Sequence, residues 1–202
     1  MNIHGYCPPI GAIITSFTIQ CVDAGRYTVL YRYGGTFDDL DIVCRTPISV
    51  IFAESPVEAG VVLKPTVPLG IAVDFIAVRR SRDPVIRGVL SGLRRAAASW
   101  WYPPLPYASV MYRTGPTYLT RRVSCHGRQD QFFVVPWSKY PYYFDRVRGS
   151  SWHSWDGRII WNAYLQRREI LRLIILLLAL AAFLWVYRTR HSIPSYLHRK
   201  LR

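Results

Sequence analysis

The longest uninterrupted apolar segment of the chain lies near its carboxyl end and predicts a membrane-spanning helix. No residue from Leu173 to Tyr187 is charged, and the apolar character extends upstream past Arg172 to Ile170. A helix over 170–187 would be about 27 Å long, against a hydrocarbon core of about 30 Å. One face of an amphipathic helix does not need so long an unbroken apolar run, which argues against a buried core helix.

Both ends of this segment suit a membrane surface. The long side chain of Arg172 allows its guanidinium to reach the headgroups, and aromatic rings at the downstream end favour the interface. The residues predicted to anchor the chain are Ile170, Leu173, Leu177, Ala181, Trp185 and Tyr187.

Upstream of residue 130, short apolar segments alternate with turn residues, which predicts a mainly β fold. The predicted strands are 13–19, 26–33, 49–53, 60–63, 71–78, 108–113 and 118–125. Such short strands between Gly and Pro turns are typical of an immunoglobulin-like antiparallel β-sandwich. The exception is 83–101, where Val85, Val89 and Leu93 have helical spacing and predict a short helix.

The composition divides the chain into five parts. The predicted parts are an N-terminal segment with a weak or missing signal (1–11), the β-sandwich (12–130), an aromatic-rich stalk with a juxtamembrane helix (131–169), the transmembrane helix (170–187) and a basic tail (188–202). The stalk aromatics fit either core packing or a belt at the membrane surface, and they also fit an exposed partner-binding surface.

The chain is strongly basic, with a formal net charge of +14. The arginines are scattered and no nucleic-acid-binding module is present, so we expect no nucleic-acid partner. Acidic lipid headgroups are a better match for the basic ends of the predicted span. The positive-inside rule favours a cytosolic tail only slightly, because arginines flank both ends of the span.

The four cysteines are Cys7, Cys21, Cys44 and Cys125, and none forms a CxxC pair. In a sandwich, the strands beside Cys21 and Cys125 can face each other across the core, so we expect a disulfide between these two residues. Such a bond persists in an oxidising compartment and agrees with a luminal domain. Reduced thiols in a cytosolic domain are the alternative, and the roles of Cys7 and Cys44 stay open.

The sequence contains no pattern that we recognise as catalytic. HExxH, GxSxG, GxxxxGK[ST] and GxGxxG are all absent, and the five histidines are scattered. Asp38, Asp39 and Asp41 form an acidic cluster after a turn, without further oxygen ligands at calcium spacing, and are interpreted as a solvated loop. We therefore expect no enzyme, no metal, no cofactor and no small-molecule substrate.

Three segments resemble the unique-short-region glycoproteins of cytomegaloviruses. The first runs from Cys21 through Gly34-Gly35-Thr36-Phe37, the second joins Cys125 to Pro136-Trp137, and the third is the Arg167-Arg168 pair before the span. The resemblance implies a single-pass protein of the endoplasmic reticulum membrane with a luminal immunoglobulin-like domain. It also implies that the protein binds MHC class I heavy chains, or their loading or degradation machinery, and retains or diverts them.

Two further expectations accompany this interpretation. The aromatic residues beside prolines are the predicted partner-binding surface, because Tyr and Trp often dominate binding energy; they are Trp100, Trp101, Tyr107, Trp137 and Tyr140. The alternative function is a tail-anchored viral accessory or structural protein with a cytosolic β-rich interaction domain.

Overall fold

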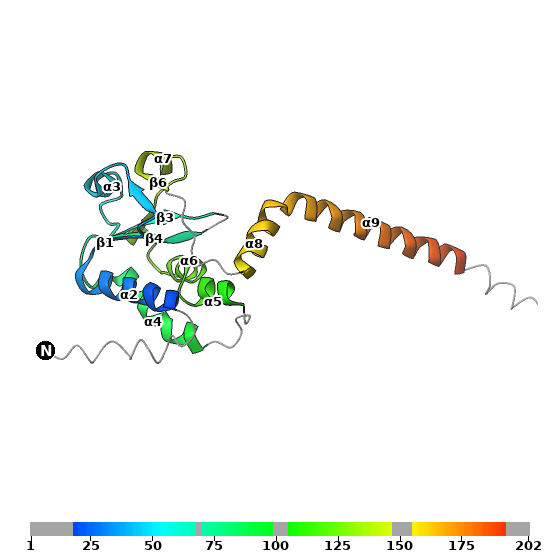
Figure 1. The fold of residues 1–202 in the computed structure, drawn as a ribbon, viewed down its shortest axis with the longest axis horizontal. Coiled ribbons are helices and arrows are strands. Elements are labelled where there is room, and N and C mark those ends of the chain that lie inside the picture. The colour runs from blue at the N-terminus through cyan, green and yellow to red at the C-terminus, as the bar shows by residue number, and fades with distance from the viewer. Residues whose placement is uncertain (1–17, 68–69, 99–104, 147–154, 193–202) are drawn as a thin grey trace, which may run out of the picture. The chain divides into compact units, whose positions relative to one another are not determined.

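A computed structural model of the protein describes residues 18–67, 70–98, 105–146 and 155–192 (Figure 1). The chain divides into two units, Met1–Gly157 and Arg158–Arg202. The strands that the structure describes all lie in the first unit.

Two small sheets form the centre of the first unit. The larger sheet has the strand order β1-β4-β3-β5, and the smaller one pairs β2 with β6. The β3–β5 pair is parallel and the other pairs are antiparallel, so the larger sheet is mixed. The strands are β1 (Gly35–Asp38), β2 (Ile42–Cys44), β3 (Val61–Pro65), β4 (Ile71–Val78), β5 (Phe132–Val134) and β6 (Phe144–Arg146).

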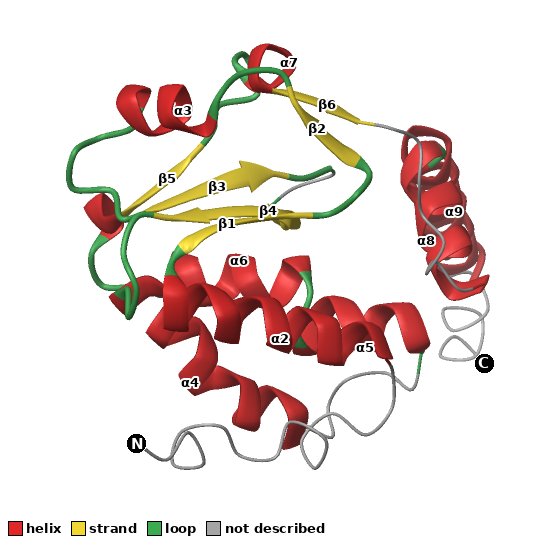
Figure 2. Ribbon diagram, turned by 60° about the vertical axis from the view of Figure 1, so that its left-hand side comes forward, coloured by secondary structure: helices red, strands yellow, loops and turns green. Residues whose placement is uncertain are grey.

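Helical segments lie on both sides of the larger sheet. Figure 2 shows α2, α4, α5 and α6 on one face, and α3, α7 and the β2–β6 pair on the other. The helices are α2 (Thr18–Tyr33), α3 (Ile48–Glu54), α4 (Pro84–Ala98), α5 (Pro106–Arg113), α6 (Pro116–Ser124) and α7 (Tyr140–Tyr143), with a 3₁₀ turn at Gln129–Gln131. Each face of the sheet thus buries its side chains against another layer.

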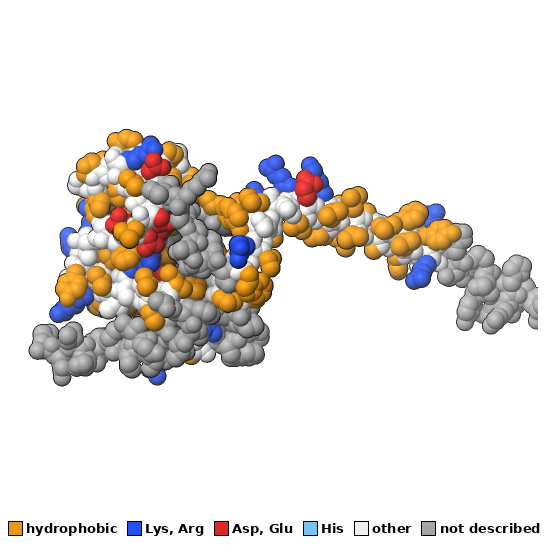
Figure 3. Space-filling view, viewed as in Figure 1, with side chains coloured by type: hydrophobic (Ala, Val, Ile, Leu, Met, Phe, Trp, Pro, Cys, Tyr) orange, Lys and Arg blue, Asp and Glu red, His pale blue; other side chains and the backbone are white. Residues whose placement is uncertain are grey.

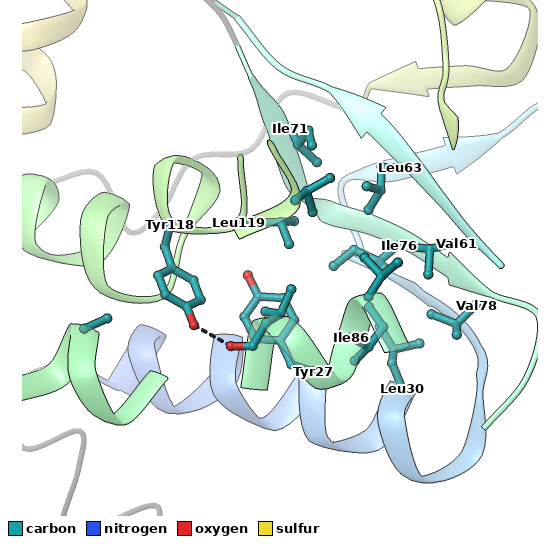
Figure 4. Packing of buried hydrophobic residues seen from close by; sticks show 14 residues of the cluster. Tyr27, Leu30, Val61, Leu63, Ile71, Ile76, Val78, Ile86, Tyr118 and Leu119 are labelled. Carbon is teal, nitrogen blue, oxygen red and sulfur yellow. Dashed lines mark hydrogen bonds between the residues drawn. The ribbon is translucent and has the colours of Figure 1, made fainter. Parts of the chain in front are cut away.

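The main core lies between the sheet and α2, α4 and α6 (Figure 4). Alternate positions along the strands point into it, so Val61 and Leu63 face the helices while Val62 faces the opposite layer. Burying one such aliphatic side chain stabilises the fold by about 1.5–3 kcal/mol. The side chains that are at most 1% exposed here include Tyr27, Leu30, Val61, Leu63, Ile76, Val78, Ile86 and Leu119.

Two buried tyrosine hydroxyls in this core are satisfied by backbone oxygens. The Tyr27 hydroxyl donates to the Thr114 carbonyl at 2.7 Å, and the Tyr118 hydroxyl donates to the Val89 carbonyl. A buried hydroxyl without a partner would cost about 1–3 kcal/mol. These bonds therefore fix the distances between α2, α4 and the α5–α6 corner.

The second, smaller core lies on the other face of the sheet. Phe75 of β4 packs edge-on against Phe144 of β6, with ring centroids 4.6 Å apart. Val62 and Ile51 belong to the same buried cluster. This cluster attaches the β2–β6 pair to the larger sheet.

The prediction of a mainly β, immunoglobulin-like sandwich is wrong, because most of the described residues are helical. The predicted strands 26–33, 49–53, 108–113 and 118–125 lie in or overlap helices α2, α3, α5 and α6. The predicted strands 60–63 and 71–78 are confirmed as β3 and β4, and the predicted helix in 83–101 as α4. Most of 13–19 lies outside the described residues.

Polar residues on the buried face of α2 conceal its helical period in the sequence. Gln20, Asp23, Ala24, Tyr27 and Leu30 are all buried and recur at helical spacing. Because Gln20 and Asp23 are polar, no apolar stripe with a 3.6-residue period is visible in the sequence.

Prolines begin α5 and α6, at positions that also bound the strands predicted there. Pro106 and Pro116 stand in the first turns of these helices. Proline is favoured there because the first N–H groups of a helix have no intrahelical partner. The same residues therefore indicate helix starts as well as turns.

The cysteines do not form the expected disulfide in the structure. Cys21 lies in α2 and Cys125 follows α6, and Cys21, Cys44 and Cys125 are thiols. The expected bond assumed two facing strands, and neither cysteine lies on a strand. Cys7 lies outside the described residues.

The second unit contains the long helix α9 (Arg167–Ser192), and α8 (Trp155–Leu165) precedes it across the unit boundary. Arg167–Arg190 is long and apolar enough to cross a membrane by length and composition, and none of its most apolar stretch is buried. Figure 3 shows apolar side chains along α9. The predicted span 170–187 lies within this helix; the anchor residues and the other domain boundaries stay predictions.

Candidate active site at the Asp39-Leu40-Asp41 turn

The turn that follows β1 holds two carboxylates on a fixed backbone. The Asp39 amide donates to the Asp74 carbonyl at 2.8 Å, and the Ile42 amide donates to the Asp39 carbonyl at 3.0 Å. Leu40, between the two aspartates, is fully exposed. Asp39 and Asp41 therefore occupy a tight, solvent-facing turn that β4 holds in place.

Two glycines make the short connection from α2 to β1 possible. Gly34 and Gly35 have φ values of 69° and 86°, a region that residues with a side chain rarely adopt. A Cβ on Gly34 would also lie 3.1 Å from the Arg80 carbonyl carbon. The tight connection places the carboxyl end of β1 beside α2, where Arg26 lies.

Arg26 of α2 is a buried cation beside this turn. Its Nη2 lies 3.2 Å from Asp39 Oδ1 and 3.5 Å from Asp23 Oδ1, while its Nη1 donates to the Val73 carbonyl. The guanidinium also lies 4.5 Å from the Phe37 ring centroid. Since the Arg26 side chain is only 2% exposed, these contacts hold one face of Asp39 in a defined position.

Asp23 is the most perturbed acid of this cluster. Burial raises its pKa from 3.8 to about 6, and the Arg26 charge and a hydrogen bond from the Thr114 hydroxyl oppose the rise. The Thr114 Oγ1 to Asp23 Oδ2 distance is 2.8 Å. Burial likewise raises the pKa of Asp39, against the lowering effect of Arg26. Perturbed buried acids beside a cation are typical of functional sites.

Two polar atoms near the turn are buried without a hydrogen-bond partner among the described residues. They are Arg26 Nε and Asp74 Oδ1. The other carboxylate oxygen of Asp74 lies 2.6 Å from Lys64 Nζ, in a pair that is largely buried. Unsatisfied buried polar atoms are rare in native proteins, and each calls for an explanation such as a bound ligand or water.

A small cavity adjoins the Asp23–Arg26–Asp39 cluster. Its volume is ≈ 30 Å³, and its lining residues are Ile19, Asp23, Arg26, Asp39, Val73, Val110 and Pro116. A cavity needs about 10–15 Å³ to hold a water molecule. It therefore has room for a water molecule but not for a larger ligand.

Asp39 and Asp41 suit a divalent cation that is shared with a substrate. Among the described residues, no group of three or more His, Cys, Asp or Glu side chains could hold a metal ion by itself. Magnesium is often bound by only one or two carboxylates together with substrate phosphates and water. The solvent-facing aspartate pair fits this second mode of binding.

One of the aromatic residues predicted to bind a partner, Tyr140, lies near this site, because its ring centroid is 5.5 Å from Lys64 Nζ, which pairs with Asp74. The Trp137 and Tyr140 rings pack in a tilted arrangement with centroids 5.3 Å apart, while the Tyr107 amide donates to Asp156 Oδ2 at 2.7 Å. Trp100 and Trp101 lie outside the described residues. A binding role for these aromatic residues stays a prediction.

Comparison with known proteins gives this turn a family context. Residues 13–58 match the family described as "Glycosyltransferase sugar-binding region containing DXD motif". Within this match the D-x-D sequence is Asp39-Leu40-Asp41.

Curated relatives match a larger part of the chain. It is 32% identical over 158 residues to inositol phosphoceramide mannosyltransferase 2 of Schizosaccharomyces pombe, which covers 72% of this chain and 43% of the relative. It is 28% identical over 153 residues to a mannosyl phosphorylinositol ceramide synthase of Saccharomyces cerevisiae, over 71% of this chain and 38% of the relative. The chain thus spans less than half the length of these proteins.

Among solved structures, the PaToxG glycosyltransferase has a TM-score of 0.37 and 20% sequence identity, over 52% of this chain and 34% of that chain. This similarity is too weak to assign a shared fold.

These similarities overturn the functional interpretation of the sequence. The resemblance to cytomegalovirus glycoproteins is wrong, and so are the MHC class I partner and the alternative viral accessory role, because the matching proteins are sugar-transferring enzymes. For the same reason, the predictions of no enzyme and no small-molecule substrate are wrong.

The sequence did contain the signal that was missed. Asp38, Asp39 and Asp41 do not match the spacing of a calcium loop, which needs many oxygen ligands from the protein. A cation shared with a phosphorylated substrate needs only two carboxylates. Arg26 could not be recognised, because a charged residue inside a predicted strand gives no indication that it is buried.

Proposed function

We propose that the first unit binds the activated sugar donor of a membrane-anchored glycosyltransferase. The observation that carries the proposal is the solvent-facing Asp39-Leu40-Asp41 turn, held by buried Arg26, within the segment that matches a sugar-binding family. The substrates and the complete reaction of the protein are part of the proposal.

In such a transfer, an acceptor hydroxyl oxygen forms a bond to the anomeric carbon while the bond from that carbon to the donor phosphate oxygen breaks. The leaving phosphate takes the electron pair, and the acceptor proton passes to a base or to water. A bound divalent cation would stabilise the negative charge on the leaving phosphate. Asp39 and Asp41 would hold that cation, and Arg26 would fix the orientation of Asp39.

For the substrates, we propose a mannosyl donor and a sphingolipid acceptor with a phosphoinositol headgroup. The names of the curated relatives support both choices. Helix α9 also supports a lipid acceptor, because it would keep the enzyme at the surface where such a lipid resides. Localisation to the endoplasmic reticulum membrane belongs to this proposal as well.

The test measures donor binding by the full chain in a non-ionic detergent. Nucleoside diphosphate mannose is titrated with Mn²⁺ and with EDTA, and the glucose form serves as a comparison sugar. The parent protein should bind the donor in Mn²⁺ and lose at least about tenfold in affinity in EDTA, since charge-assisted contacts are worth about 1.5–3 kcal/mol.

Asp41→Asn should show the same loss in Mn²⁺, because it removes one of the two carboxylates. Asp38→Asn is the matched control, since Asp38 is a neighbouring exposed aspartate outside the D-x-D pair. Binding that is independent of the metal, or an equal loss in both variants, would contradict the proposal.

A further inference from the structure

A second cavity of the first unit lies between α4 and α6. Its volume is ≈ 340 Å³, and its lining residues are Ser91, Gly92, Arg95, Arg121 and Arg122. It shares no lining residue with the small cavity beside the Asp39-Leu40-Asp41 turn. Small-molecule sites typically measure about 300–1,000 Å³, so this cavity is large enough for a compact ligand or headgroup.

In the part of the chain that the structure describes, no acidic side chain pairs with the arginines of this cavity. Three of its five lining residues are arginines, and no ion pair of the described residues includes any of them. All twelve acidic residues of the chain lie within the described residues, so their side chains are included in this comparison. The cavity therefore presents concentrated positive charge to solvent.

Arg122 is held in place within the cavity wall. Its Nε and Nη2 donate to the Gly88 carbonyl of α4 at 3.1 and 2.6 Å, and Nη2 also lies 3.4 Å from Ser91 Oγ. A guanidinium has five N–H donors, so these bonds leave donors on Nη1 for a ligand. Arg122 is therefore already ordered in the free protein, so a ligand loses little affinity to ordering this side chain.

Gly92 leaves the space that this arrangement needs. A Cβ at this position would lie 2.7 Å from Arg122 Nε, 2.9 Å from Arg122 Cζ and 2.8 Å from Tyr118 Oη. Any side chain would therefore push Arg122 or Tyr118 away from α4. The glycine allows two helices to approach closely around an arginine.

We propose that the α4–α6 arginine cavity binds a phosphoryl group. Arginine is suited to phosphate because its planar fork can donate two hydrogen bonds to one phosphate. An alternative role for these arginines is interaction with the partial negative charge at the carboxyl ends of α4 and α6. That role does not explain the cavity, the space left by Gly92 or the hydrogen bonds that hold Arg122 against α4. The phosphoryl group is carried by a phospholipid headgroup or by a soluble phosphate ester, and this site is independent of the proposed sugar-donor site.

The experiment uses the full chain in a non-ionic detergent at fixed ionic strength. Three probes are titrated: inorganic phosphate, glycerophosphoinositol and dihexanoyl phosphatidylinositol. The test variant is Arg95→Gln/Arg121→Gln, which removes two exposed arginines from the wall and keeps Arg122. The control variant is Arg32→Gln/Arg80→Gln, which removes two exposed arginines elsewhere and matches the change in net charge.

At least one probe should bind the parent and the control with equal affinity and bind the test variant at least about tenfold more weakly, as expected for lost charge-assisted hydrogen bonds. If inorganic phosphate or glycerophosphoinositol binds in this way, a soluble phosphate ester is sufficient. If only the dihexanoyl lipid does, the ligand is a membrane lipid. The proposal is overturned if no probe binds the parent, or if the two double variants lose affinity equally.

Discussion

The buried carboxylate of Asp23 should contribute less to the stability of the protein at neutral pH than at pH 4. Its side chain is 2% exposed and its pKa is raised from 3.8 to about 6, chiefly by burial. One unit of pKa difference corresponds to about 1.36 kcal/mol. Ionisation of Asp23 therefore lowers the free energy of unfolding by about 3 kcal/mol, because the acid binds its proton more tightly in the folded state than in the unfolded chain. The stabilising contribution of protonated Asp23 is fully present below pH 3.8, the unfolded pKa, and is lost as the pH rises through the folded pKa of about 6.

The variant Asp23→Asn isolates this contribution. An amide oxygen can still accept the hydrogen bond from Thr114, and Arg26 keeps Asp39 as a partner. Asp23→Asn should therefore match the parent near pH 4 and exceed it by about 3 kcal/mol near pH 7.5. For a domain of this size, the difference corresponds to about 6–12 °C in Tm.

The assay is thermal unfolding of the full chain in detergent at several pH values between 4 and 7.5. The quantity of interest is the difference in Tm between each variant and the parent, which cancels the titration of groups that both proteins share. Asp38→Asn, which removes an exposed carboxylate, should give a flat difference. A flat difference for Asp23→Asn would refute the reasoning, because it would mean that folding does not raise the pKa of this acid.

Three further predictions concern packing and the membrane helix. Gly92→Ala should destabilise the protein by about 1–3 kcal/mol in denaturant unfolding because its Cβ meets atoms closer than 3 Å, whereas Gly127→Ala, with nothing within 4 Å, should be nearly neutral. Phe75→Ala should cost about 3–5 kcal/mol because the ring is fully buried, while Tyr142→Ala at an exposed ring should cost under 1 kcal/mol in the same measurement. Leu178→Arg should raise the free energy of membrane insertion of α9 by about 3–4 kcal/mol, because it adds an arginine and removes a leucine. The fraction of chain extracted from membranes at alkaline pH should rise; unchanged extraction would contradict a spanning role.

Sequence reasoning succeeded where burial and hydrophobicity agree. β4 was predicted with its observed bounds, because both faces of Ile71–Val78 are largely apolar. Helix α4 was found because Val85 and Val89 are apolar, buried and at helical spacing. The long apolar run of α9 was evident from composition alone.

It failed where the buried residues are polar or where one residue type fits two structures. The polar residues on the buried face of α2 include Asp23 and Arg26, which build the candidate site, so the requirements of the site masked the helix that carries it. The predicted fold class is wrong because strands are predicted where the structure has helices α2, α5 and α6. The proximity of Arg26 to Asp39 depends on the path of the chain through Gly34 and Gly35, which hydrophobic periodicity does not reveal.

The larger sheet can be completed only after synthesis has passed Val134, because β3 pairs with β5 from Val61–Phe132 to Leu63–Val134. Contacts between residues so far apart in sequence are slow to form. Until β5 docks, one edge of β3 offers unpaired N–H and C=O groups that can pair with another chain. Nascent or truncated chains that end before residue 132 should therefore be the species most in need of chaperones.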